Sequence, residues 1–405
     1  PAQRARVHAA RESLAQAQLA AALAPDAVAR ARAEGGVLRA ESELAALARE
    51  LAAPVATLPA PRAGELFVHV VADGDRVLLL ARDADGRVHA VETRPGEVAA
   101  LVRAARRALG GETWPDYLWR LPDGRLVEGL LRPDPGAWRV PDKEALALLE
   151  AALTQPLVPH LAGVQRVVFA PDGAIALLPM EALRADGKAL GLHRDVSYAH
   201  SALVAQAAVQ ATAAARSASD AARGLIALGV ARPMLQPATL DPRLAALRWQ
   251  PLPAVAEEID TVARSLPGVP ARKLAGAAAS ESAVRALDAS GALGQARYLH
   301  VAAHAWYSDA SPDLSALVLG EPSPGRDPTA GYLTAAELRG LRLRAELVVL
   351  SACTSSGGSV LSGEGLSGLA HALLAAGAQG VVVSLWPVAD APTAKLMREF
   401  YARLG

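Results

Sequence analysis

The pattern of hydrophobic positions divides the chain into a helical start and a longer region of mixed structure. In residues 1–52, leucines recur at roughly helical spacing in an alanine-rich background, which predicts two helices around a break at Pro25 and Asp26, near the pair Gly35 and Gly36. Two helices cannot bury their own apolar faces. We therefore expect this segment to pack on the rest of the protein or to continue an upstream helical array.

From Gly64 the hydrophobic period becomes that of strands. Residues 65–71, 76–82 and 87–92 are short β-rich runs separated by turns of Asp and Gly, which predicts a meander of hairpins. A helix is predicted to follow over residues 96–109.

Beyond Pro141, strand-like and helix-like runs alternate. Strands are predicted over 165–170, 196–199, 224–230, 297–303, 346–352 and 379–385. Helices are predicted over 201–214, 253–266, 280–287, 364–376 and 391–404. This alternation predicts an α/β fold whose mostly parallel sheet is flanked by helices on both faces. The nearly all-apolar runs 347–350 and 381–383 fit the centre of that sheet.

The local composition indicates where the parts of the chain meet. Residues 211–223 are rich in Ala and Ser, which indicates a seam, and residues 321–331 are rich in Pro and Gly, which indicates an insertion. We expect three parts. These are a helical segment over 1–60, an N-terminal half with the meander over 61–215, and a second half over 216–405.

Charge and cysteine content exclude several classes of protein. Lys and Arg number 41 and Asp and Glu number 41, so the chain has no global basic field for nucleic acid. No apolar run reaches the ~18 residues that a membrane-spanning helix needs. Cys353 is the single cysteine, which excludes an internal disulfide framework and a zinc site of paired thiolates. The nine histidines form no cluster at metal-ligand spacing, so we expect neither a metal nor a cofactor.

Two chemically useful side chains end predicted strands. Reacting groups of a parallel sheet gather at the carboxyl ends of its strands, and His304 ends one predicted strand while Cys353 ends another. If those strands are neighbours, their ends lie ~5 Å apart. A thiol of pKa ~8.5 is mostly protonated at pH 7, so an adjacent imidazole is useful as its base and later as the acid for a leaving amine.

Each of these residues also has a plain structural explanation. Cys353 alone fits a buried small side chain, and His304 alone fits a hydrogen-bonded histidine at a strand end. The pair is more informative, because both lie at the same predicted edge and the small residues 354–358 leave room for a substrate backbone. Their separation of 49 positions is close to the ~50 residues that separate the two in caspases.

A glycine motif offers an alternative chemistry. Residues 363–368 spell G-x-G-x-x-G, and Asp390 follows at the distance that a dinucleotide site favours. A Rossmann unit places its first glycine directly after the strand, whereas Gly363 comes 10 positions after Cys353. We therefore favour a helix start whose glycines allow close packing, and nucleotide binding is the alternative.

Several ordered segments resemble one known family. They are HVAAH at 300–304, LVVLSAC at 347–353 and SLWPV at 384–388, with VFAPDG at 168–173, LPMEAL at 178–183 and VSYAHS at 196–201. From about residue 64 to residue 405 the chain thereby resembles the CHAT family of caspase-like cysteine peptidases, which are often found behind tetratricopeptide repeats. The resemblance implies a caspase-haemoglobinase type of fold, with a degenerate N-terminal half and a catalytic C-terminal half.

The resemblance also implies roles for individual residues. His304 would be the general base and acid, and Cys353 the nucleophile. The backbone N–H groups of Ala305 and Cys353 would form the oxyanion hole. The family usually has glycine after the histidine, where this chain has Ala305.

A substrate pocket is predicted around the same strand ends. Trp306 is expected either to form its wall or to anchor the following loop, since aromatic residues serve both uses. Asp309, Glu364 and Asp390 lie in predicted loops or turns nearby, where a carboxylate would select a basic residue before the scissile bond. A helix cap or a solvated position explains each of these acidic residues more simply.

We therefore interpret the chain as a bacterial, cytoplasmic cysteine endopeptidase that acts on a protein substrate. A reducing compartment suits a cysteine nucleophile. We expect control by a regulatory protein or an upstream helical-repeat module, and no direct binding to nucleic acid or membrane. The alternative is a catalytically silent scaffold of the same fold that binds proteins through its N-terminal helices.

Overall fold

The computed structural model describes residues 27–51, 60–111, 117–129, 135–199, 223–233, 249–307, 312–321, 330–354, 364–386 and 388–404, with a few positions before residue 21. For residues 352–354 and 364–367, for Glu128 and for part of 27–51, it describes the backbone alone. The chain divides into two compact units. One consists of residues 57–208 with 361–364, and the other of residues 1–56, 209–360 and 365–405.

The unit of residues 57–208 is built on a five-stranded sheet in the order β10-β7-β1-β2-β3. Strands β1 (Glu65–Asp73), β2 (Arg76–Arg82) and β3 (Val88–Thr93) form an antiparallel meander, so this prediction is confirmed. Gly74, with a φ of 58°, occupies the tight turn between β1 and β2, where the left-handed backbone favours glycine. β7 (Arg166–Pro171) and β10 (Asp195–Tyr198) add parallel strands on the other side of β1.

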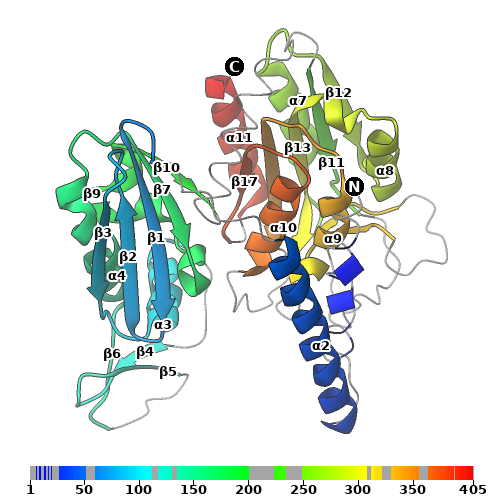
Figure 1. Cartoon of the computed structure of the whole chain (residues 1–405). Coiled ribbons are helices and arrows are strands. Elements are labelled where there is room, and N and C mark those ends of the chain that lie inside the picture. The colour runs from blue at the N-terminus through cyan, green and yellow to red at the C-terminus, as the bar shows by residue number, and fades with distance from the viewer. Residues whose placement is uncertain are drawn as a thin grey trace. The chain divides into compact units, whose positions relative to one another are not determined.

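Two helices cover one face of this sheet. α3 (Val98–Ala108) and α4 (Asp142–Leu153) pack against each other behind the strands in Figure 1. Smaller pieces complete the described part of the unit: β4 (Tyr117–Arg120), β5 (Leu126–Gly129), β6 (Trp138–Arg139), β8 (Arg184–Ala185) and β9 (Lys188–Ala189). Its 3-10 turns are η1 (Gln155–His160), η2 (Gly173–Leu177), η3 (Met180–Ala182) and η4 (Leu190–Leu192).

The other unit is built on a seven-stranded sheet. Five parallel strands lie side by side in the order β12 (Ala271–Ala275), β11 (Gly224–Gly229), β13 (Ala296–Trp306), β16 (Leu347–Thr354) and β17 (Val381–Val383). The pairing of β11 with β13 ends at Ala302. Beyond it, on the same side of β13, β14 (Ala316–Val318) pairs antiparallel with residues 304–306. β15 (Tyr332–Thr334) pairs with β14.

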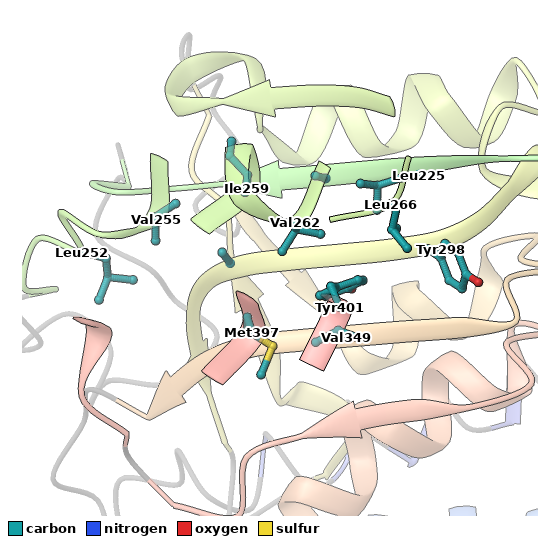
Figure 2. Close-up of a cluster of buried hydrophobic side chains, with 12 residues drawn as sticks. Leu225, Leu252, Val255, Ile259, Val262, Leu266, Tyr298, Val349, Met397 and Tyr401 are labelled. Carbon is teal, nitrogen blue, oxygen red and sulfur yellow. The ribbon is translucent and has the colours of Figure 1, made fainter. Parts of the chain in front are cut away.

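Helices pack on both faces of this larger sheet. α7 (Val255–Arg264) and α11 (Asp390–Leu404) pack together, and Figure 2 shows their buried side chains around Tyr298 and Val349 of the strands. Connections of the usual right hand place α8 (Glu281–Ala289), α9 (Ala335–Gly340) and α10 (Glu364–Ala375) on the opposite face. Its 3-10 turns are η6 (Gly276–Ala278), η7 (Leu293–Gln295) and η8 (Pro312–Leu314).

The mixed α/β architecture and most of the predicted strands and helices within the described residues are confirmed, with ends that shift by a few positions. β13 and β16 run farther than predicted, to Trp306 and Thr354. Helix α2 (Ala27–Leu51) continues through Gly35 and Gly36 without a break. The predictions for residues 201–214, 211–222 and 322–329 lie outside the described residues. The domain boundaries at residues 60 and 215 stay a prediction.

Candidate active site

The strands that carry His304 and Cys353 are neighbours. β13 and β16 run parallel, and the Cα atoms of His304 and Cys353 are partners in their register. β13 continues for two residues past His304 and β16 for one residue past Cys353, so both residues lie near the carboxyl ends of their strands. The sheet therefore brings the predicted base and the predicted nucleophile to adjacent backbone positions.

The imidazole of His304 is buried, and its Nε2 has a backbone partner. It is 1% exposed, and its Nε2 lies 2.6 Å from the backbone oxygen of Gln250. The ring of Trp249 lies against it, with 5.2 Å between ring centroids. A carbonyl oxygen only accepts hydrogen bonds, so Nε2 donates its proton and Nδ1 carries the lone pair of the neutral ring. This tautomer leaves Nδ1 as the basic atom.

The protonation state of His304 follows from its surroundings. Burial lowers the pKa of His304 below its ordinary value of 6.5. The Gln250 carbonyl and the negative charge of Asp390 act in the opposite direction without cancelling the effect of burial. At neutral pH the ring is therefore in the uncharged form that accepts a proton.

The Gln250 carbonyl is a functional group that sequence reasoning missed. Leu252 N donates to Ala231 O at 2.8 Å, which ties this segment to the end of β11. Pro251 disfavours a helical backbone at Gln250, so the helical turns begin only after it. Every residue carries a backbone carbonyl, and hence no residue type could have signalled this contact.

Ala305 lies inside the sheet. It is fully buried in β13 and is paired both with Leu317 of β14 and with Thr354 of β16. Successive residues of a strand turn their backbone N–H and C=O groups to opposite neighbouring strands. Glu346 N donates to Arg297 O, so the odd-numbered residues of β13 turn these groups toward β16. By this alternation the N–H of Ala305 points toward β16 and the N–H of Cys353 toward β13. The two predicted oxyanion donors thus face each other's strands.

The predicted pocket residues have diverse positions. Trp306 is 3% exposed and packs with Ala316, Val318 and Tyr332 beneath the β14–β15 hairpin, which makes it an anchor for that hairpin. Asp309 lies outside the described residues, and Glu364 is the first residue of α10, described by its backbone alone. Asp390 begins α11, and its Oδ2 accepts a hydrogen bond of 2.7 Å from Ala254 N, just before α7.

Comparison with known proteins identifies the family. Residues 143–405 match the profile of the CHAT domain. The chain belongs to the CHAT family. It is also similar to Tetratricopeptide repeat protein 28 of Mus musculus, at 33% identity over 210 residues, and to its namesake in Homo sapiens, at 32% over 209 residues. Each match covers 43% of this chain and 8% of the relative, so the chain spans a small part of the length of these curated relatives.

The CHAT match includes every candidate residue of the site. It begins at residue 143, and the meander of β1 to β3 lies outside it although the sequence resemblance was drawn from about residue 64. The CHAT family and the association with tetratricopeptide-repeat proteins, both inferred from sequence segments, are confirmed.

A second polar group lies deeper in the CHAT domain. His300 is fully buried, with Nδ1 3.2 Å from Tyr401 Oη and Nε2 3.0 Å from Glu258 Oε1. These bonds join β13 to α11 and α7, so His300 supports the packing of the sheet. Within the described residues, no group of three or more His, Cys, Asp or Glu side chains is arranged to hold a metal ion. No helix in the described part of the chain is long and apolar enough to span a bilayer.

Proposed function

We propose that this CHAT protein is a cysteine endopeptidase in which Cys353 is the nucleophile and His304 the general base and acid. The observation that supports the proposal is the register of β13 and β16, which makes the two residues backbone partners near the carboxyl ends of parallel strands. The tautomer of His304 supports it further, because Nε2 is occupied by the Gln250 carbonyl and Nδ1 is the basic atom.

The proposed reaction is an acyl transfer in two steps. Nδ1 of His304 takes the thiol proton, and the sulfur attacks the carbonyl carbon of the scissile peptide bond. The protonated imidazole then gives that proton to the leaving amine, which leaves a thioester on Cys353. Water, deprotonated by the same ring, hydrolyses the thioester and restores the free thiol. No metal or cofactor takes part in this sequence.

The oxyanion hole requires a local change of backbone. The N–H groups of Ala305 and Cys353, proposed as its donors, point along the sheet toward the facing strands. The last pairs of the β13–β16 ladder must therefore separate before these donors meet a substrate oxyanion. One such donor contributes ~3 kcal/mol of transition-state stabilisation, so this opening would control activity strongly. While these last pairs of β13 and β16 are formed, the two N–H groups cannot bind an oxyanion. This observation favours the second candidate function, a catalytically silent scaffold.

The wider organisation is part of the same proposal. We propose a caspase-haemoglobinase type of fold with a degenerate half over 61–215, a catalytic half over 216–405 and a helical docking segment over 1–60. The names of the mouse and human relatives support control by a tetratricopeptide-repeat module or another regulatory protein. A bacterial, cytoplasmic setting and a protein substrate complete the proposal. Asp309 and Glu364 remain the candidates for selecting a basic residue before the scissile bond.

Labelling of Cys353 by a neutral electrophile such as iodoacetamide tests the dyad. We expect His304→Ala to slow labelling at pH 7 by about 10²-fold, because a positioned base contributes at least that much. His193→Ala, which removes an exposed histidine of the other unit, should leave the rate unchanged. Equal labelling of the unmutated protein and His304→Ala would refute the dyad.

Cleavage tests the peptidase itself. The unmutated protein, together with any upstream repeat region, is incubated with a proteome, and new N-termini are sequenced. We expect new fragments with the unmutated protein and none with Cys353→Ala. Cleavage that persists in Cys353→Ala would contradict the mechanism. Fast, His304-dependent labelling without any cleavage would favour the scaffold.

A further inference from the structure

The contact between His304 and Gln250 depends on a short segment that carries no charge of its own. Residues 249–254 run along the ring of His304 and lead into α7. Among the described residues, three interactions hold this segment: the packing of Trp249 against the cluster that includes Tyr332 on β15, the bond from Leu252 N to Ala231 O, and the bond from Ala254 N to Asp390 Oδ2. The carboxylate of Asp390 is the one anchor among these three that carries a charge at neutral pH.

Asp390 is placed to act as a rigid anchor. It is the first residue of α11, and α11 is fixed by Met397 and Tyr401, which are 7% and 0% exposed in the core. Its acceptor bond comes from Ala254, the N-cap residue of α7, which has no capping side chain of its own. The carboxylate thus lies at the N-termini of two helices, where both helix dipoles favour a negative charge.

We propose that Asp390 is a positioning residue for the dyad: by accepting the Ala254 N–H, it holds the turn that presents the Gln250 carbonyl to His304. This inference rests on the proposed cysteine-peptidase function. It gives the acidic residue a task other than the selection of a basic substrate side chain, because the carboxylate is already engaged by the backbone of α7.

The charge of Asp390 has a second effect on the same ring. It favours the protonated form of His304, against the burial that disfavours it. The elements around His304 carry other titratable groups as well: Cys353 on β16, Tyr332 on β15, and His300 on β13 with its partners Glu258 and Tyr401. The remaining charged residues of α7 and α11 are more exposed. Among the described groups, Asp390 is the one whose charge raises the pKa of His304. Loss of this charge therefore makes His304 harder to protonate.

Two substitutions of Asp390 separate the effect of its hydrogen bond to Ala254 from the effect of its charge. Asp390→Asn keeps an oxygen that accepts from Ala254 N but removes the charge, whereas Asp390→Ala removes both. Asp288→Asn is the matched control, because the Oδ1 of Asp288 also accepts a remote backbone N–H, that of Arg342 at 2.9 Å. Each full-length variant is labelled with iodoacetamide between pH 5 and pH 9, and the rate constant is plotted against pH.

We expect Asp390→Asn to keep the plateau rate within about twofold and to move the acid midpoint down by about half a pH unit, since one negative charge near the dyad is lost. We expect Asp390→Ala to lower the plateau about tenfold, because a displaced base transfers the proton less efficiently. A purely structural role would leave the midpoint of Asp390→Asn unmoved.

The outcomes distinguish this inference from the function on which it rests. If His304→Ala slows labelling but both Asp390 variants match Asp288→Asn in rate and midpoint, the positioning role is refuted and the dyad stands. If His304→Ala labels as fast as the unmutated protein, the dyad itself is refuted. Asp390→Asn is nearly isosteric, so it remains informative even where Asp390→Ala lowers the thermal midpoint of unfolding.

Discussion

One backbone oxygen makes the two ring nitrogens of His304 chemically different: Nε2 carries the proton, and Nδ1 carries the lone pair. The carbonyl of Gln250 fixes the proton on Nε2 at 2.6 Å, and the ring is 1% exposed, so water does not compete for that bond. A buried, neutral imidazole with a single tautomer is ready to accept a proton through Nδ1.

Nuclear magnetic resonance of ¹⁵N-labelled histidine tests this arrangement directly. We expect the His304 ring, assigned by its loss in His304→Gln, to show a protonated Nε2 and an unprotonated Nδ1 at pH 7. We expect its pKa to lie below 6.5, because burial outweighs the Gln250 carbonyl and Asp390. A ring that carries its neutral proton on Nδ1 would contradict the assignment.

The same lowered pKa makes a prediction about stability. Because His304 has its ordinary pKa when unfolded, the unfolded chain takes up the proton first as the pH falls. The free energy of unfolding should therefore decrease as the pH falls from about 6.5 toward the lower pKa of the folded state. Urea unfolding at several pH values should show a shallower decrease over this window in His304→Gln than in the unmutated protein; equal slopes would argue against a lowered pKa.

The sequence predicted the dyad but not its support. His304 and Cys353 could be proposed as a dyad because each is a chemically distinctive side chain at the end of an apolar run. Gln250 could not be found, because its contribution is a carbonyl that any residue supplies. Trp306 stayed ambiguous because its role depends on the β14–β15 hairpin, whose strands have three residues each and are too short for a periodic pattern.

At the level of elements, β13, α7 and α11 form the support of the site. Near the carboxyl end of β13 they meet through His304, Gln250 and Asp390, and four residues earlier through His300, Glu258 and Tyr401. The start of β13 was predictable from its apolar run. Its end was not, because residues 304–306 belong to the strand through their pairing with β14, a segment distant in the sequence.

Removal of Glu258 tests how much the deeper group contributes. Glu258 is 2% exposed and lies 3.0 Å from His300, so Glu258→Ala leaves a buried imidazole without this partner. We expect a loss of about 3 kcal/mol or more in the free energy of unfolding, measured with urea. Glu257→Ala, at the exposed neighbouring position of α7, should change it by less than about 0.5 kcal/mol. Similar small losses for both variants would show that the buried pair contributes little.

At the scale of the whole molecule, the chain comprises two compact units whose sequences have different patterns. The unit of residues 57–208 combines an antiparallel meander with two parallel strands, and the other unit is mainly parallel. The periodicity of the chain predicted this contrast, because hairpins need only short turns whereas parallel strands need helical crossovers. It did not reveal that β7 and β10 complete the sheet of the meander, since the pairing of β1 with β7 joins segments about a hundred residues apart.

This pairing predicts which fragment folds alone. β1 lies between β2 and β7, and Leu66, Val68 and Phe169 are fully buried in that sheet, so residues 57–208 contain a complete core. We expect the 57–208 fragment to unfold cooperatively in urea, since a domain of ~150 residues buries enough surface for independent stability. A 57–140 fragment keeps the meander but lacks β7 and α4, and should show no cooperative transition by circular dichroism. If the 57–208 fragment shows no cooperative transition, its core is not sufficient for independent stability.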